Sequence, residues 1–123
     1  MKTTKDVIME YFSAFNKNKG WDGIVTSEVS ITSPTGTIKG KEGFVEMTNQ
    51  FRQLVTSAKV RSIISDEEQA SALTMYELEL PTGDKLALNV AEIIRVKGQK
   101  IDSFEIYFDT AQFNEFMSKM NSN

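Results

Sequence analysis

The stretch LALNVAEIIRVKGQKIDSFEIYFD, residues 86–109, decides the fold of this chain. Two runs rich in Val, Ile, Phe and Tyr, residues 86–96 and 100–109, flank a short connection that contains Gly98. β-Branched and aromatic residues are typical of strands, and a glycine between two such runs is typical of a hairpin. The stretch therefore predicts a long antiparallel ribbon, and the remaining elements pack over one of its faces.

The connection leaves two strand registers open. A two-residue turn on Lys97 and Gly98 pairs Val96 with Gln99, whereas a three-residue connection pairs Val96 with Lys100. The two registers differ by one residue, which exchanges the faces of one strand relative to the other. The three-residue connection separates apolar from polar side chains better, and we adopt it. Its inner face carries Leu88, Val90, Glu92, Ile94, Phe104, Ile106 and Phe108.

The composition bounds the class of protein. The chain has 123 residues, of which 40% are hydrophobic and 25% are charged, as expected for one globular domain over residues 1–123. Its net charge of -3 and its scattered lysines argue against a nucleic-acid partner. No apolar run approaches the roughly 20 residues that cross a bilayer, so we expect no membrane partner. The N-terminus lacks the apolar segment of a signal peptide, which favours a cytoplasmic protein.

Cysteine and histidine are both absent from the sequence. Their absence excludes disulfides, a thiol nucleophile, thiolate or imidazole metal ligands, and a Ser-His-Asp triad. We therefore expect no metal site and no cofactor. Any acid–base chemistry must use Asp, Glu, Tyr or Lys.

Periodicity and turn residues predict the other elements. Apolar residues at helical spacing predict helices over residues 4–19 and 41–55, a short helical turn over 21–25, and a last helix from about Asp109. The strand-like runs are residues 28–33, 37–39, 57–65 and 70–80. This order predicts an α+β protein whose helices gather on one side of a curved sheet.

Four motifs extend this prediction to a family. They are EYFSAFNKNKGWDGIV (10–25), SITSPTG (30–36), GKEGF (40–44) and VKGQKIDSFEIYFDTAQF (96–113). Together they resemble the nuclear transport factor 2-like superfamily, which includes SnoaL-like polyketide cyclases and ketosteroid isomerases. The resemblance implies a curved antiparallel sheet that forms a cone-shaped half-barrel, with helices packed on its concave face around a hydrophobic pocket. The fold does not by itself select a function, because this superfamily includes enzymes, binding modules and interaction domains.

The resemblance also carries over to individual residues. Ketosteroid isomerases hold an enolate oxygen with a tyrosine on the first helix and an acid on the penultimate strand, which match Tyr11 and Glu92. Their general base is an aspartate directly before the proline of a Pro-x-Gly turn, and that position is Ser33 here. A serine cannot act as a base without a neighbour that accepts its proton. Proton transfer by the family's usual arrangement is therefore not predicted.

Glu92 and Tyr11 each have two interpretations. In an apolar pocket, desolvation raises the pKa of the Glu92 carboxyl, and the protonated acid can donate a hydrogen bond to a carbonyl. In the shorter hairpin register, Glu92 instead lies on a solvent or dimer face. Tyr11 lies on the buried stripe of the first helix, and its hydroxyl bonds either Glu92 or a backbone carbonyl.

Two other acidic residues have competing roles. Glu77 lies opposite Leu88 on the inner face if residues 81–84 form a four-residue loop, and it then supplies a second carboxyl near the pocket mouth. The favoured alternative is a solvated glutamate at the sheet edge. Asp109 ends the last strand and precedes Gln112 by three residues, the spacing of a helix N-cap and its partner.

We predict a protein that binds a small apolar molecule. It acts either as a cofactor-free isomerase, cyclase or dehydratase on a carbonyl compound, with Tyr11, Glu92 and Glu77 as catalytic residues, or as a binder without turnover. A third possibility is an interaction module that uses the outer sheet face. Ala91, Ile93 and Tyr107 on that face also predict a homodimer. The expected ligand-binding residues are Phe15, Trp21, Ser33, Met47, Phe51, Met75, Leu88, Val90, Phe104, Ile106 and Phe108.

Overall fold

A computed structural model describes residues 2–121 of the chain. Its helices are α1 (Thr4–Lys17), α2 (Lys41–Arg52) and α3 (Thr110–Ser118), with 3-10 segments at Trp21–Ile24 and Lys119–Asn121. Its strands are β1 (Val25–Ser33), β2 (Gly36–Lys39), β3 (Val55–Ser65), β4 (Gln69–Glu79), β5 (Lys85–Lys97) and β6 (Lys100–Tyr107). No helix in the described part is long and apolar enough to cross a membrane.

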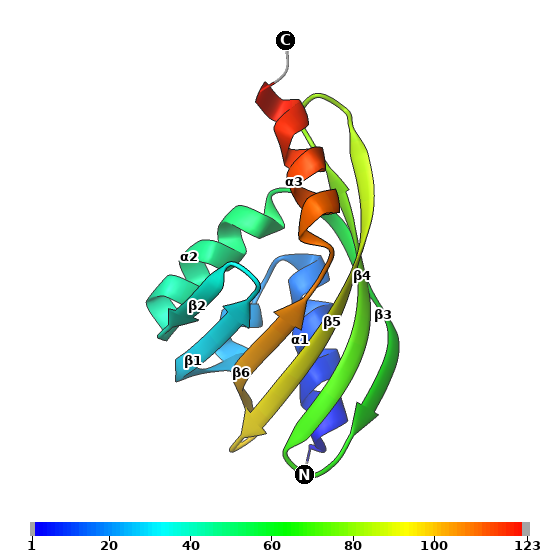
Figure 1. Cartoon of the computed structure of the whole chain (residues 1–123). Coiled ribbons are helices and arrows are strands. Elements are labelled where there is room, and N and C mark those ends of the chain that lie inside the picture. The colour runs from blue at the N-terminus through cyan, green and yellow to red at the C-terminus, as the bar shows by residue number, and fades with distance from the viewer. Residues whose placement is uncertain (1, 122–123) are drawn as a thin grey trace.

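The strands form one curved sheet in the order β2-β1-β6-β5-β4-β3, and α1 and α2 lie on the same side of it (Figure 1). This confirms the predicted α+β fold with helices over the concave face. The sheet is mixed rather than wholly antiparallel, because β1 pairs with β6 in parallel. These two strands are distant in the sequence, so no tight turn between them imposes antiparallel pairing.

The β5–β6 hairpin has neither of the two predicted turns. Lys97 pairs with Lys100, so the turn consists of Gly98 and Gln99. Both turn residues have positive φ, 58° and 64°, as a type I′ turn requires. This pairing differs by one residue from the predicted pairing of Val96 with Lys100. By itself, the difference would place the side chains of one strand on the opposite face from the predicted one.

A bulge restores the predicted faces. The register shifts between Arg95 and Val96: Val96 pairs with Ile101, whereas Arg95 pairs with Ser103. The extra residue is Asp102, whose carboxylate accepts a hydrogen bond of 2.7 Å from the Thr26 hydroxyl on β1. Beyond the bulge, the even-numbered residues of both strands again share the inner face.

Side chains cap helices α1 and α3, and the predicted cap at Asp109 is confirmed. Thr3 and Asp6 form a reciprocal capping box at the start of α1, and the Asp109 carboxylate accepts from the Gln112 N–H at 3.0 Å at the start of α3. Helix α1 ends at Lys17 with Asn18 in the left-handed conformation, slightly before the predicted end. Its buried stripe against the sheet is Val7, Ile8, Tyr11, Phe12 and Phe15.

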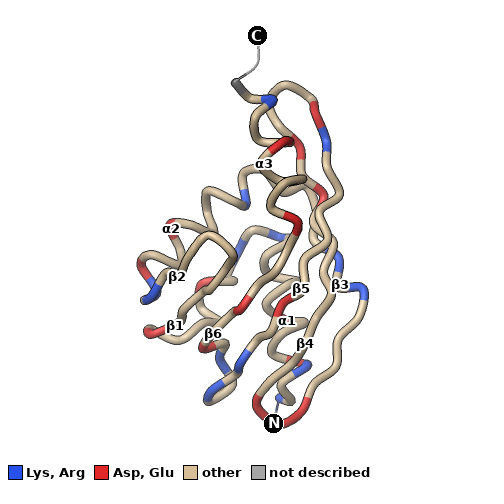
Figure 2. The backbone as a smooth tube through the Cα atoms, in the orientation of Figure 1, with Lys and Arg blue, Asp and Glu red and all other residues tan. Residues whose placement is uncertain are grey.

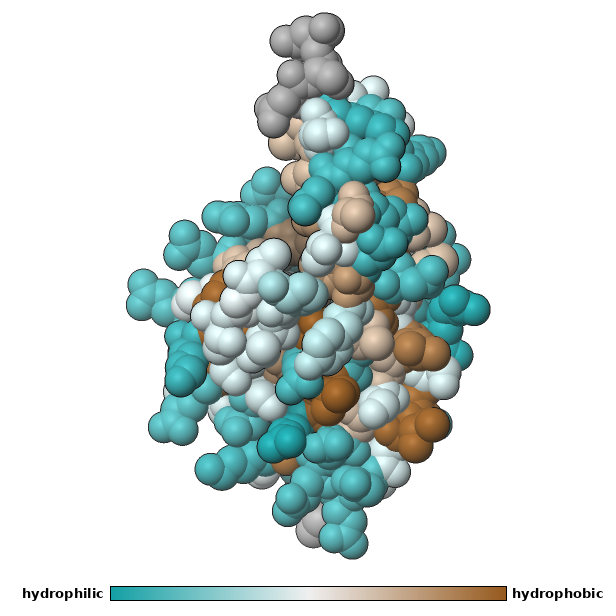
Figure 3. Space-filling model, viewed as in Figure 1, coloured by the Kyte–Doolittle hydropathy of each residue, from teal (hydrophilic) through white to brown (hydrophobic). Residues whose placement is uncertain are grey.

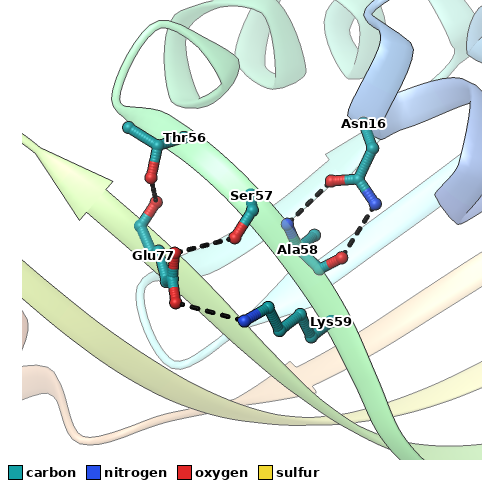
Figure 4. Close-up of polar contacts among 6 residues, drawn as sticks. All are labelled: Asn16, Thr56, Ser57, Ala58, Lys59 and Glu77. Atoms are coloured by element: carbon teal, nitrogen blue, oxygen red, sulfur yellow. Dashed lines mark hydrogen bonds and ion pairs between the residues drawn. The ribbon is translucent and has the colours of Figure 1, made fainter.

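Polar side chains lock the end of α1 to the sheet. The Asn16 amide donates to the Ala58 carbonyl at 2.8 Å and accepts from the Ala58 N–H at 2.7 Å, as a neighbouring strand does (Figure 4). Arg52 donates to the carbonyls of Phe15, Asn16 and Val55. Its guanidinium also lies 5.5 Å from the centroid of the Phe15 ring. These contacts fix Phe15 where it faces the concave side of the sheet.

Candidate functional site

A cavity of about 620 Å³ lies between the concave face of the sheet and the three helices. Its walls are mainly apolar and aromatic, as in most small-molecule sites. The exposed side chains along its lining are the neutral hydroxyls and amides of Thr35, Thr37, Gln50 and Gln53, together with the apolar Met120. The inner wall includes Phe15, Phe44, Phe51, Phe104, Phe108 and Phe113.

Glu92 is the charged side chain of this wall. It lies on β5 opposite Ile106 of β6 and is 4% exposed. The Tyr76 hydroxyl, from β4, donates to both of its carboxyl oxygens at 3.2 and 3.1 Å. Glu92 thus sits among apolar neighbours with a single phenol as its hydrogen-bond donor.

Burial raises the pKa of the Glu92 carboxyl to about 7, because removal from water penalises the ionised form. The hydroxyls of Thr74 and Tyr76 oppose this shift. The Thr74 hydroxyl lies close enough to the carboxyl to lower its pKa, although its buried oxygen makes no hydrogen bond of standard geometry within the described residues. The carboxyl therefore exchanges its proton close to neutral pH, where it can serve as an acid or as a base.

Tyr11 lines the cavity but does not bond Glu92. Its ring packs 5.3 Å from that of Phe104, measured between centroids, and burial followed by the nearby Glu92 charge raises the pKa of its phenol. Within residues 2–121 its hydroxyl has no hydrogen-bond partner. The two interpretations of Tyr11 were therefore both wrong about its partner, and Tyr76 provides the phenol that bonds Glu92.

Tyr76 was missed because the β4–β5 loop is shorter than predicted. The Leu80 N–H donates to the Asp84 carbonyl at 2.9 Å, so three residues, 81–83, close the loop instead of four. Tyr76 consequently pairs with Leu88, where the four-residue loop places Glu77. The signal available in the sequence was the alternation along β4, which includes Tyr76. Assigning Tyr76 to the inner face from this alternation required the correct loop length.

Glu77 therefore points away from the cavity. Its carboxylate accepts from the Ser57 hydroxyl at 3.0 Å and lies 3.5 Å from the Lys59 ammonium, on the outer side of β3 and β4 (Figure 4). The predicted inner-face position of Glu77 is wrong. The alternative is right that Glu77 is solvated, since its side chain is 44% exposed, but β4 lies between β3 and β5 and is not the sheet edge. The same slip carries Met75 to the outer face, away from the predicted ligand wall.

Most of the other predicted wall residues line the cavity, but Trp21 does not. Trp21 is buried behind the wall, where its ring meets Phe44 edge-on at 6.2 Å and its Nε1–H donates to Asn18 at 3.2 Å. It is therefore packing, not lining. The residues that do line the cavity are Phe15, Ser33, Met47, Phe51, Leu88, Val90, Phe104, Ile106 and Phe108. Lining residues that the sequence analysis missed include Tyr76, Phe113 and Met117.

Ser33 lies at the β1–β2 turn without a base beside it. Its hydroxyl oxygen is 2.9 Å from the Thr35 hydroxyl and 3.5 Å from the Gly36 carbonyl. Neither group is a general base at neutral pH. The aspartate function that ketosteroid isomerases place at this position thus has no equivalent here among the described residues.

Comparison with known proteins finds one family model and many solved structures of the same fold. The model of the SnoaL-like domain matches residues 8–104. An NTF2-like protein of unknown function from Burkholderia pseudomallei has 18% sequence identity and a TM-score of 0.84, covering 96% of this chain and 99% of that chain. A protein from Kribbella flavida has 20% identity and a TM-score of 0.82, covering 96% of each chain.

A third similar structure is that of an enzyme. SalBIII, an epoxide hydrolase/cyclase-like enzyme of pyran ring formation in salinomycin, has 15% identity and a TM-score of 0.79. The alignment covers 87% of this chain and 91% of SalBIII. Similarity at this level establishes a shared fold. No curated protein sequence matches the chain.

Proposed function

The chain belongs to the SnoaL-like domain family, and from that premise we propose that it binds a small, largely apolar carbonyl compound in the cavity. The protonated Glu92 carboxyl donates a hydrogen bond to the carbonyl oxygen. The observation that carries this proposal is a buried acid in the cavity wall with one hydroxyl donor and a pKa of about 7. A carboxylic acid kept neutral by an apolar site is an effective hydrogen-bond donor.

Tyr11 supports the same ligand geometry. Its hydroxyl lacks a partner within the described part of the chain and borders the same cavity as Glu92. A ligand carbonyl has two lone pairs and can accept from both groups at once. The apolar walls then hold the ligand body, and the neutral hydroxyl and amide groups near solvent suit an uncharged outer end.

Acetylnaphthalene is a suitable probe of this proposal, measured by isothermal titration calorimetry at pH 6 and pH 8. A group with a pKa of about 7 is roughly 90% protonated at pH 6 and roughly 10% at pH 8. Affinity for the ketone should therefore fall about tenfold between these pH values. Glu92→Gln retains an N–H donor and should bind with little pH dependence.

Glu77→Gln is the matched control, because it makes the same chemical change on the outer face. It should bind the ketone as the wild-type protein does. Ketone affinity that is independent of pH in the wild-type protein, or lost in both variants alike, contradicts the proposed role of Glu92.

A second candidate function is proton transfer by Glu92 itself. As a carboxylate, a group with a pKa of about 7 is well matched to act as a base at neutral pH, and the free Tyr11 hydroxyl can donate to the oxyanion that forms. Loss of the methyl proton signal of acetylnaphthalene in D2O tests this, since enolisation exchanges those protons. Exchange should rise with pH through 7 and vanish in Glu92→Gln; without exchange above the solvent background, binding alone stands.

We also propose that the protein forms a homodimer through the outer sheet face. Leu73, Ala91 and Tyr107 form one cross-strand row there, and Leu73 and Tyr107 are 54% and 51% exposed. Figure 3 shows hydrophobic side chains over this side of the sheet.

Light scattering at micromolar concentration tests the homodimer. The wild-type protein should have the mass of two chains, and Leu73→Glu should have the mass of one. Met9→Glu changes an exposed side chain on α1, away from the sheet face, and should leave the mass at two chains. A wild-type mass equal to one chain removes the proposal.

A further inference from the structure

The cavity contains a carboxyl without a counter-ion. Among the described residues, Glu92 is the charged side chain of the wall, and no Lys or Arg forms an ion pair with it. The other titratable groups that face it are the phenols of Tyr11 on α1 and Tyr76 on β4. Strand β6 and helices α2 and α3 border the described cavity with apolar, hydroxyl and amide side chains. Elsewhere, positive and negative residues intermingle along the chain (Figure 2).

The same carboxyl has unfilled hydrogen-bonding capacity. An ionised carboxylate has about four lone-pair positions. One hydroxyl, that of Tyr76, approaches both Glu92 oxygens, at 3.2 and 3.1 Å, so a single proton is shared between them. The ionised state of Glu92 therefore leaves acceptor positions open, which suits a ligand that enters the cavity with several donors.

Aromatic rings share the cavity wall with this carboxyl. The Tyr76 ring packs against Phe51 at 5.2 Å and against Phe15 at 6.0 Å, and Tyr11 packs against Phe104 at 5.3 Å, between centroids. All five rings border the cavity. Aromatic faces attract cations, and they do so more strongly where water is excluded. A cavity wall that combines these rings with one uncompensated carboxyl is thus complementary to an organic cation.

We propose that the cavity also binds apolar primary amines as ammonium ions, with the ionised Glu92 carboxylate as their counter-ion. This inference rests on the cavity of the proposed function but not on its carbonyl ligand. The ammonium supplies three donors to the open positions on the carboxylate, and the aromatic walls hold the apolar body. While Glu92 is ionised, carboxylates and phosphates are disfavoured, because they bring a second negative charge to a cavity whose described lining has no cationic side chain.

The two ligand classes use opposite protonation states of one group. A ketone needs the acid form of Glu92, and an ammonium needs the carboxylate. An aliphatic amine stays protonated to about pH 10, as a lysine side chain does. Between pH 6 and pH 8 the ligand charge is therefore constant, and the protein group alone titrates. Affinity for the amine rises with pH over the range in which affinity for the ketone falls.

Naphthylethylamine and its neutral analogue naphthylethanol form the test pair, titrated calorimetrically at pH 6 and pH 8. For a carboxyl with a pKa of about 7, amine affinity in the wild-type protein should rise about tenfold across this range. The alcohol should show no such rise. In Glu92→Gln, amine affinity at pH 8 should drop at least tenfold, to that of the alcohol, and lose its pH dependence.

Glu77→Gln again serves as the control, since it removes one negative charge outside the cavity, and it should keep the amine response. The proposal is overturned if amine and alcohol bind alike in the wild-type protein, or if wild-type amine affinity does not rise with pH. These wild-type measurements decide the matter even if Glu92→Gln fails to fold. Acetylnaphthalene reports separately on the carbonyl proposal, so either proposal can fail while the other stands.

Discussion

Two glutamates on neighbouring strands of one sheet have opposite surroundings. Glu92, on the concave face of β5, is 4% exposed and bonded to a phenol. Glu77, on the convex face of β4, is 44% exposed and bonded to a serine and a lysine. The side chains are chemically identical, and the strand face alone separates them. Burial without a counter-ion makes the first a titrating group near neutral pH, whereas solvent and Lys59 surround the second.

The two faces also differ in what holds their residues in place. On the concave face, Tyr76 is fixed by ring contacts with Phe15 and Phe51 and by its bond to Glu92. On the convex face, the ion pair of Lys59 and Glu77 joins two half-exposed side chains across 3.5 Å. Exposed pairs of this kind contribute little to stability, because water and salt screen them. The concave face should therefore dominate both the stability and the chemistry of the protein.

The adjacent residues Tyr76 and Glu77 give the largest expected contrast. Tyr76→Ala empties a buried aromatic site and should lower the free energy of unfolding by about 3–5 kcal/mol. Glu77→Ala removes exposed contacts and should cost at most about 1 kcal/mol. Urea denaturation followed by circular dichroism measures both. If the two variants lose similar amounts of unfolding free energy, the concave and convex faces do not differ in their contribution to stability.

A pH series should show a smaller contrast that belongs to Glu92 alone. The folded protein holds this proton to about pH 7, whereas the ordinary value of the group is 4.5. Folding therefore takes up a proton between these values, and stability falls as the pH rises through this window. The shift corresponds to about 3 kcal/mol lost by pH 8.

Glu92→Gln removes this loss, since its amide does not titrate. The difference in unfolding free energy between the variant and the wild-type protein should grow in favour of the variant by about 3 kcal/mol between pH 4.5 and pH 8. Comparing the two proteins at each pH cancels the contribution of the other carboxyls. If the unfolding free energies of the two proteins change in parallel with pH over this range, Glu92 is not buried as an isolated acid.

The smallest expected effect is on the convex face. Lys59→Met breaks the ion pair with Glu77 and should change the free energy of unfolding by about 0.5 kcal/mol or less. Added salt should shrink even this difference, because it screens exposed charges. Urea denaturation at low and high salt provides the measurement. A loss above about 2 kcal/mol places this pair among the stabilising contacts and makes the two faces energetically alike.

The sequence predicted what depends on local pattern. The buried stripe of α1 follows from helical spacing, and the cap at Asp109 follows from a side chain that bonds the backbone three residues on. The inner face of β5, with Glu92 on it, was also predicted, because alternation along a half-buried strand is a strong signal. These features needed no knowledge of distant contacts.

The partners of Glu92 were not predicted, because they depend on counting residues through turns. The predicted loop before Lys85 was one residue too long. That error placed Glu77 and Met75 on the concave face, where the structure has Tyr76. The parallel pairing of β1 and β6 likewise joins segments far apart in the chain. Tyr76 and Glu92 lie on the same face of the sheet only when a three-residue loop joins β4 to β5. Their hydrogen bond could therefore not be predicted from the four-residue loop.

Because of the bulge at Asp102, the side chains of β5 and β6 share their faces correctly only when the turn and the bulge are considered together. The two-residue turn and the one-residue bulge together restore an even offset, so either one changed alone inverts a whole strand. Single-residue insertions or deletions in this hairpin should be lost from descendants of this gene, whereas paired ones, one in the turn and one at the bulge, should survive. Length variation among its descendants is thus expected in steps of two.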